Sequence, residues 1–315
     1  DPVTGKVGYC SIMGANKEFY GLGIHKGSEG LNALDKIAKG EHLSDNMAAV
    51  TIQNCIMVSF DSRSYIEPEE MDIIKKTGVT FDNRNFWPQF KDYTPGYYPW
   101  LITKEQVDFL IIAIEQATIV CTEHKDVHIP FAAMREEWKF LVRIPSKKGY
   151  TVSWKDKIST PANHDETLRI SVINEKNELS ARNIKKTINS RSNVAWEIDF
   201  FYLPEPVRDN AQERPYFSYL FLIVDSSCGV ILKLDMSPPF KNYANEFRRA
   251  FLDAVIENGF YPEKIYLKNE ATYNILEPIA KILKIKIERH KNLKMLDEAR
   301  DDLSKSFKVK NILKK

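Results

Sequence analysis

The last third of the chain has the clearest pattern of apolar and polar positions. Strand-forming residues come first, and two of these runs turn on each other at Ser226–Gly229. Segments with apolar residues at helical spacing then alternate with short apolar runs. This predicts a strand at 194–203, two strands within 217–236, strands at 262–269 and 285–290, and helices at 245–259, 271–284 and 296–307. We therefore expect a three-stranded meander followed by helix, strand, helix, strand and a final helix.

The first 124 residues mix the two periodicities in a less regular order. The pattern predicts strands at 7–14, 19–25 and 54–62, and helices at 28–40, 67–78 and 103–124. The last of these helices begins with Thr103 and Gln106, which fit a capping box. Residues 81–100 are rich in aromatic residues and proline, and we predict a long ordered loop fastened by the rings of Trp87, Tyr97, Tyr98 and Trp100.

A change of pattern near residue 140 indicates a domain boundary. Beyond it, β-like runs at 139–146, 150–158 and 168–173 precede a polar, helical stretch at 174–190. We predict an α+β protein of two domains, 1–140 and 141–315.

Charge and cysteine content add few constraints. The net charge is +2, from 45 basic and 43 acidic residues, which neither demands nor excludes nucleic acid. The basic end, "KSFKVKNILKK", is typical of a solvated tail. Four scattered cysteines predict small, buried side chains in a reducing cytoplasm rather than a disulfide framework. Because no apolar run approaches the roughly 18 residues of a membrane span, we expect a cytoplasmic protein with no membrane partner.

Asp199 lies in "AWEIDFFYLP", a strand that places one carboxylate among aromatic residues. This strand resembles the "W..D" strand that opens the catalytic core of transposases and retroviral-type integrases. "YLFLIVDSSCGVI" and "YPEKIYLKN" resemble the second and third segments of that core, in the same order. The resemblance covers residues 195–307 and implies a ribonuclease H-like fold for the second domain.

The same resemblance implies a set of metal ligands, because that family holds two divalent ions with carboxylates from separate elements. Asp199 takes the first position, and the second falls on Lys268–Asn269, which carries no carboxylate. Glu270 is close in sequence to the second position, and Glu298 or Asp301 stands where the third ligand belongs. The ligand set is therefore degenerate, and Mg²⁺ or Mn²⁺ would be the cofactor only if enough of it remains.

Asp225 is a further candidate ligand, but it begins the turn between two strands. Asp and Ser at such a position support the backbone by local hydrogen bonds, and we favour that role. For Asp199 we likewise favour a structural or vestigial role over a working metal site.

Three other groups of residues invite functional interpretations. Cys121, His124 and His128 suit Zn²⁺, but the set is partial, and we favour a solvated helix end. The four glycines of "GLGIHKGSEG" match neither phosphate-loop pattern, and packing is the better explanation. The aromatic residues of 81–100, with Arg84 and Lys91 nearby, suit stacking on bases or holding a peptide, although we favour a plug in the core.

A second resemblance concerns most of the chain. "YGLGIHKGSEG", "FDNRNFWPQFKDYTPGYYPW" and "WEIDFFYLPEPV" together resemble an uncharacterised bacterial family that joins two domains of unknown function. It implies no activity. Our leading hypothesis is a non-catalytic binding or scaffold module, without a cofactor, on a degenerate ribonuclease H-like core. The alternatives are a metal-dependent nuclease or transposase-like enzyme, and a nucleic-acid-binding protein without catalysis; the partner, a protein or a nucleic acid, is open.

Overall fold

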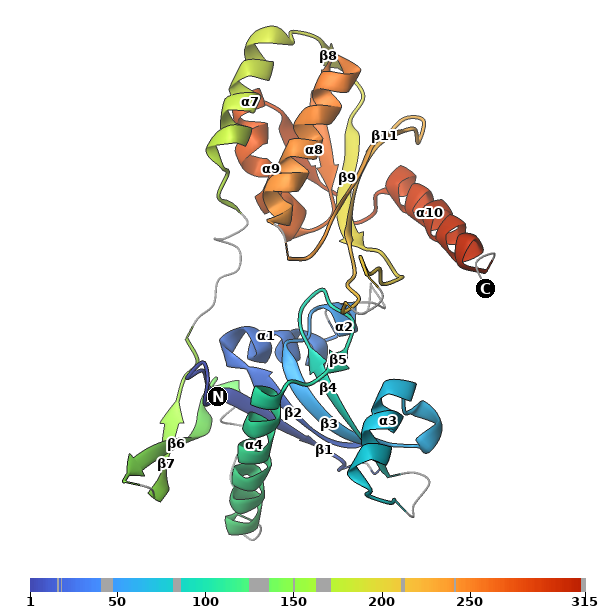
Figure 1. Cartoon of the computed structure of the whole chain (residues 1–315). Helices are drawn as coiled ribbons and strands as arrows, with labels where there is room; N and C mark the ends of the chain where they lie inside the picture. The colour runs from blue at the N-terminus through green and yellow to red at the C-terminus, as the bar shows by residue number, and fades with distance from the viewer. Residues whose placement is uncertain are drawn as a thin grey trace. The chain divides into compact units, whose positions relative to one another are not determined.

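The chain forms two compact units in the computed structural model. The structure describes residues 1–15, 17, 19–40, 48–81, 86–124, 136–149, 151–162, 171–210, 213–240 and 242–312. The first unit comprises Asp1–Pro95 and Pro99–His164, and the second comprises Gly96–Tyr98 and Asp165–Lys315. Each unit is described by itself below, with the elements labelled in Figure 1.

The first unit is built on an antiparallel sheet of five strands in chain order. The strands are β1 (Gly8–Met13), β2 (Tyr20–Lys26), β3 (Cys55–Asp61), β4 (Trp87–Tyr93) and β5 (Trp100–Leu101). The remaining elements are α1 (Gly27–Ala38), α2 (Ala48–Thr51), the 3-10 turn η1 (Arg63–Tyr65), α3 (Pro68–Thr77), α4 (Lys104–Glu123), β6 (Phe140–Lys148) and β7 (Thr151–Ser159). The helices and strands predicted before residue 80 and the helix at 103–124 are confirmed.

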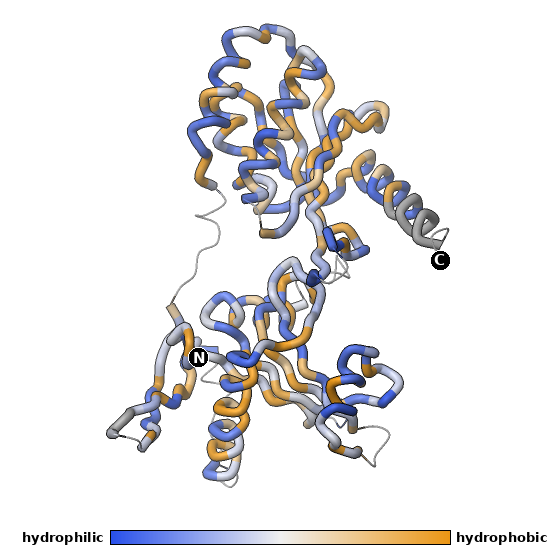
Figure 2. The backbone as a smooth tube through the Cα atoms, in the orientation of Figure 1, coloured by the Kyte–Doolittle hydropathy of each residue, from blue (hydrophilic) through white to orange (hydrophobic). Residues whose placement is uncertain are grey.

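Helix α4 packs on one face of this sheet. Its capping box is present as predicted, because the Thr103 side chain accepts from the Gln106 amide and the Gln106 side chain accepts from the Thr103 amide. The buried core joins helix and sheet through Leu22, Ile24, Ile56, Val58, Phe109, Leu110 and Ala113. Figure 2 shows hydrophobic residues along these strands and along α4.

The prediction of a long loop over 81–100 is wrong for its described centre, which forms β4 and β5. Proline lowered the expectation of a strand because it cannot donate to a ladder. Pro88 pairs with Phe60 on β3, but β5 reaches only Lys91 and Asp92, so the outer side of β4 at Pro88 is an edge. Proline is tolerated at such an edge, and the partner strand supplies the order that local propensity lacks.

Two further predictions near residue 140 need correction. The strands at 139–146 and 150–158 form the hairpin β6–β7, but the hairpin groups with the first unit, although we placed the second domain from 141. Phe140 packs edge-on against Tyr9 of β1 at 5.2 Å, which explains this grouping. The strand expected at 168–173 is absent from its described part, 171–173.

The second unit is built on a five-stranded sheet with helices on both faces. Its sheet order is β11-β10-β9-β13-β14, with β9, β10 and β11 antiparallel and β9, β13 and β14 parallel. The strands are β9 (Trp196–Tyr202), β10 (Tyr219–Asp225), β11 (Ile231–Ser237), β13 (Lys264–Leu267) and β14 (Lys286–Arg289), with a small pair β8 (Arg191–Ser192) and β12 (Tyr261–Pro262). The helices are α7 (Glu175–Thr187), α8 (Tyr243–Asn258), α9 (Glu270–Leu283) and α10 (Lys294–Ile312). The order predicted for the last third is confirmed.

The alternation of side chains along β9 decides what each face of this sheet holds. Trp196 and Ile198 are fully buried in the cluster that includes residues of α7, α8 and α9. Phe201 faces the other way, into a cluster with Leu222 of β10 and Leu296 of α10. Because side chains alternate with a period of two, Glu197 and Asp199 also lie on the α10 face.

Three of the four cysteines are exposed, contrary to the prediction that they are buried. Cys10, Cys121 and Cys228 lie on an edge strand, near the end of α4 and in a turn, and only Cys55 is buried. All four are free thiols. In the described part of the chain, none of the helices combines the length and apolar character required to cross a bilayer.

Candidate functional site

Asp199 is buried in the centre of the second sheet, with 5% of its surface exposed. Its Oδ1 atom accepts three hydrogen bonds: from Asn269 Nδ2 at 2.6 Å, from Phe200 N at 2.9 Å and from Thr272 Oγ1 at 3.0 Å. These donors come from β9 itself and from the start of α9. The carboxylate is therefore held by neighbouring polar groups of the protein.

Asn269 reaches Asp199 because it follows β13, the parallel neighbour of β9, in which Leu267 lies opposite Ile198. It is also the N-cap of α9, where its Oδ1 accepts from Thr272 N at 2.8 Å. This capping bond decides the orientation of the amide: turning it over would place its oxygen against the Asp199 carboxylate. Asn269 thus presents a donor to Asp199, not a ligand oxygen.

Burial raises the pKa of Asp199, and the hydrogen bonds from Thr272, Phe200 and Asn269 oppose that rise. The charge of Arg300 on α10 also favours the ionised form. The Arg300 guanidinium lies over the ring of Phe201, 4.4 Å from its centre. The electrostatics around Asp199 are those of a desolvated acid compensated by local donors.

The other residues implied for the second and third metal positions point to different partners. Lys268 forms an ion pair with Asp297 of α10 at 3.0 Å. Glu270, with its side chain 60% exposed, forms an ion pair with Arg289 of β14 at 2.6 Å. Glu298 is exposed on α10. The structure therefore brings Asn269 to Asp199, and it engages Lys268 and Glu270 elsewhere.

Asp225 caps the turn after β10. Its Oδ1 accepts from Ser227 N at 2.8 Å, Ser227 Oγ at 2.5 Å and Cys228 N at 3.2 Å. It lies opposite Trp196, three residues along β9 from Asp199, so the two carboxylates are about 10 Å apart along the strand and on opposite faces. Burial disfavours ionisation of Asp225, but the hydrogen bonds from Ser227 and Cys228 outweigh it and lower the pKa. The turn interpretation of Asp225 agrees with this geometry.

Sequence reasoning missed Glu197, a second buried carboxylate on the α10 face of β9. Its Oε2 accepts from Leu296 N at 2.8 Å, in the first turn of α10. Burial raises the pKa of Glu197, and the backbone amides of Leu296 and Met295 oppose the rise. The alternation in Trp-Glu-Ile-Asp was the available signal, because it puts both acids on one face of the strand.

The residues present do not fit a two-metal centre. Two ions need converging hard oxygen ligands, whereas Asn269 turns its NH₂ group toward Asp199 and Lys268 is a cation paired with Asp297. Among the described residues, no group of three or more His, Cys, Asp and Glu side chains is placed to hold a metal ion. We derive no catalytic step through a metal.

The four aromatic residues singled out from the sequence belong to two separate clusters. Trp87 of β4 packs against Phe81 in the first unit, with the guanidinium of Arg63 5.1 Å from its ring centre. Trp100 of β5 lies opposite Asp92 of β4 in the same unit. Tyr97 and Tyr98 are grouped with the second unit.

Tyr97 and Tyr98 are fastened by Tyr216, Phe217 and Arg214 of the second unit. Tyr97 forms a β-bridge to Tyr216, and the Tyr98 ring packs 6.3 Å from that of Phe217. Arg214 donates to Tyr98 O at 2.8 Å and lies over the Tyr97 ring. Both rings are half-buried, which favours a structural plug for this pair.

The structure also places the residues of the possible zinc set and of the glycine-rich segment. His124 is the C-cap of α4 and Cys121 lies in its last turn, while His128 falls outside the described residues, as does Arg84. Of the glycines in 21–30, Gly30 packs so tightly that a Cβ would lie 2.5 Å from Asn54 O. This close approach supports the packing role expected for the glycines.

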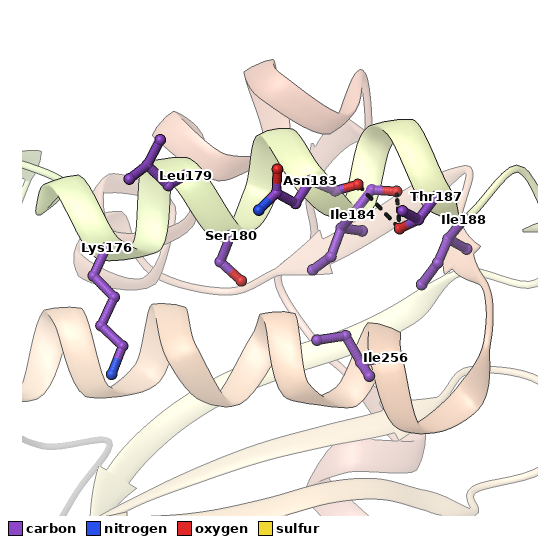
Figure 3. Close-up of a pocket in the computed structure, with 8 residues that line it drawn as sticks. All are labelled: Lys176, Leu179, Ser180, Asn183, Ile184, Thr187, Ile188 and Ile256. Carbon is purple, nitrogen blue, oxygen red and sulfur yellow. Dashed lines mark hydrogen bonds between the residues drawn. The ribbon is translucent and has the colours of Figure 1, made fainter.

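A shallow groove runs between α7 and α8 in the second unit (Figure 3). It has a volume of about 570 Å³ and is lined by Lys176, Leu179, Ser180, Asn183, Ile184, Thr187, Ile188 and Ile256. Thr187 Oγ1 is engaged with Asn183 O at 3.0 Å inside the helix. An apolar floor with one ammonium group offers contact surface, but no acid–base pair for catalysis.

Two family models match segments of the chain, and both describe domains of unknown function. Residues 1–143 match the family model described as domain of unknown function DUF7309, and residues 180–304 match the one described as domain of unknown function DUF6930. None of the curated proteins compared matches the chain. The two matches fit an uncharacterised two-domain family and assign no activity or site residue.

Proposed function

We propose that the second unit is a non-catalytic binding or scaffold module on a degenerate ribonuclease H-like core. The order of its sheet supports the fold relationship: a meander of three antiparallel strands, with β13 and β14 added in parallel beside β9. Helices α8 and α9 follow β11 and β13, and α10 closes the chain, which is the order expected of that core.

The single observation that carries the proposal is the hydrogen bond from Asn269 to Asp199. In a two-metal enzyme, acids at these two positions repel each other and a cation holds them together. Here an amide donates to the acid at 2.6 Å, which replaces the repulsion between two acids with a hydrogen bond. The alternative, a nuclease using Asp199 with Asp225, Glu270 or Glu298, has to recruit groups that already cap a turn, pair with Arg289 or face solvent.

Melting temperatures and cleavage assays with the full chain test this proposal. We expect no Mn²⁺-dependent cleavage of single-stranded or duplex DNA or RNA, and no rise in the melting temperature with Mn²⁺ or Mg²⁺. A ligand at 100 times its Kd stabilises the folded state by about 2.7 kcal/mol, so a functional site gives a readable shift.

Two variants distinguish the outcomes. Asp199→Asn keeps an acceptor oxygen for Asn269 and Thr272, so it is expected to fold, and Asp225→Asn is the matched control in the same sheet. Mn²⁺-dependent cleavage that persists in Asp225→Asn and disappears in Asp199→Asn overturns the proposal. A metal-induced rise in melting temperature that only Asp199→Asn removes does the same.

A further inference from the structure

We propose that the β6–β7 hairpin is a nucleic-acid-binding arm that contacts the phosphate backbone of a duplex. This surface belongs to the first unit, and the inference does not rest on the function proposed for the second. Residues 140–159 carry five basic residues and one acidic residue: Arg143, Lys147, Lys148, Lys155, Lys157 and Asp156. The hairpin therefore holds a net charge of +4 in a chain whose total is +2, so the rest of the chain is net negative.

The hairpin is a sheet of its own with two nine-residue strands. Figure 1 shows it outside the five-stranded sheet of the first unit. Seven of the nine residues of β7 are exposed, so both faces of this strand are open. An isolated two-stranded hairpin is only marginally stable in water, and this one is fastened at its base by Phe140, which packs on Tyr9 of β1 and on Trp138.

The register separates the side chains into two faces. Lys155 lies opposite Ile144 and Lys157 opposite Val142, on the face that also carries Ser146 and Ser153. Asp156 lies on the other face and forms an ion pair with its cross-strand partner Arg143 at 3.0 Å. Among the described side chains of the hairpin, the face of Lys155 and Lys157 thus carries positive charge, hydroxyl groups and the apolar Phe140, Val142 and Ile144, with no carboxylate.

The dimensions of this face match a duplex. Lys155 and Lys157 are two residues apart in a strand, about 6.8 Å, which equals the rise along the DNA helix axis over two phosphates of one strand, about 3.4 Å each. The major groove of DNA is about 12 Å wide and admits a two-stranded ribbon. Hydroxyl groups such as those of Ser146 and Ser153 are common donors to phosphate oxygens.

Fluorescence anisotropy of a labelled 20-base-pair duplex of mixed sequence (about two turns, longer than the roughly 30 Å ribbon) measures binding of the full chain. The logarithm of the binding constant is expected to fall linearly with the logarithm of NaCl concentration. Each phosphate contact contributes about 0.9 to the slope, so Lys155→Gln with Lys157→Gln reduces it by about 1.8. At 0.1 M salt this corresponds to a loss of affinity of roughly 60-fold.

The matched control is Lys185→Gln with Lys186→Gln, which removes the same charge from exposed positions on α7 and leaves binding unchanged. Asp156→Asn removes the hairpin's single acid and is expected to tighten binding, whereas a purely structural effect of that ion pair weakens it. Absence of duplex binding by the wild-type chain overturns the inference, as does a slope that the 155/157 variant leaves unchanged. Lysine-dependent binding to vesicles of anionic lipid, with none to the duplex, also overturns it.

Discussion

Arg248 provides a direct test of how the helices of the second unit are held together. It lies on α8 with none of its surface exposed, and it donates from Nε to Ile275 O at 2.7 Å and from Nη2 to Asn274 O at 3.4 Å. In a regular helix, Asn274 O accepts from the amide of residue 278, but Pro278 has no N–H. Arg248 therefore donates to Asn274 O in place of the amide that Pro278 lacks.

The structure also gives the size of the effect expected for Arg248→Met. Methionine keeps the apolar stem but removes every donor, including those to Val172 O at 2.8 Å and Asn245 Oδ1 at 2.9 Å. Burial lowers the pKa of Arg248 to about 10, so the guanidinium stays charged at neutral pH and depends on these bonds for compensation. Each buried acceptor that Arg248→Met leaves unsatisfied costs about 1–3 kcal/mol, so losing several of these bonds removes a large part of the roughly 5–15 kcal/mol that stabilises a domain.

The assay is a urea titration read by hydrogen-exchange mass spectrometry on β10 peptides, which reports the free energy of unfolding of the second unit alone. Arg249→Met is the matched control, because its side chain is 47% exposed and its ion pairs with Asp235 and Glu246 are worth at most about 1 kcal/mol. Pro278→Ala restores the amide, so in that background Arg248→Met should cost about 0.5–1.5 kcal/mol less. If Arg248→Met and Arg249→Met lower the free energy of unfolding equally, the buried hydrogen bonds of Arg248 do not stabilise the unit as argued. If the effects of Arg248→Met and Pro278→Ala are strictly additive, Arg248 does not compensate for the missing amide of Pro278.

Two further predictions concern a pH dependence and a packing contact. Because burial raises the pKa of Asp199 above 3.8, the contribution of Asp199 to stability falls as the pH rises from 3.8 through the raised pKa; the difference in urea midpoint between wild type and Asp199→Asn should therefore change over this range. The sign is opposite for Asp225, whose lowered pKa makes its contribution disappear as the pH falls, and Asp225→Asn should lose less stability in acid. Gly30→Ala should destabilise the first unit by more than about 2 kcal/mol, although Ala favours helix, because its Cβ meets Asn54 O at 2.5 Å and His25 C at 2.8 Å. A β3 hydrogen-exchange pattern equal to that of the wild type contradicts the packing argument.

The elements of the last third were predictable because each carries its own start and stop signals. Gly259 ends α8 in the left-handed conformation, and Asn269 begins α9 as an N-cap. The strands alternate with these helices and have the apolar character of a buried sheet. By contrast, β4 depends on its neighbour: Pro88 argues against a strand although the surrounding rings favour one, and pairing with β3 makes the strand.

The candidate site was predictable as a position but not as a set of contacts. The resemblance assigned Asp199 to the first ligand position and Lys268–Asn269 to the second. Asp199 and Asn269 are 70 residues apart in the chain. Which atom of Asn269 faces the carboxylate depends on the cap of α9 together with the register of β9 with β13, and that register is not written locally in the sequence. The position of Glu197 was accessible from strand alternation alone.

The two carboxylates on the α10 face of β9 share one structural task. Glu197 accepts an amide of the first turn of α10, and Asp199 accepts from Asn269, the N-cap of α9, so each acid lies at the positive end of a helix. Both sets of contacts fasten a helix to the centre of the sheet. In a two-metal enzyme, carboxylates at the positions of Asp199 and Asn269 repel each other until cations neutralise them. With Asn269 in the second position, the repulsive pair becomes a donor–acceptor pair, and the core can form without a cation. That exchange explains how such a core can keep its acidic strand and its packing after catalysis is lost, which is the history we propose for this unit.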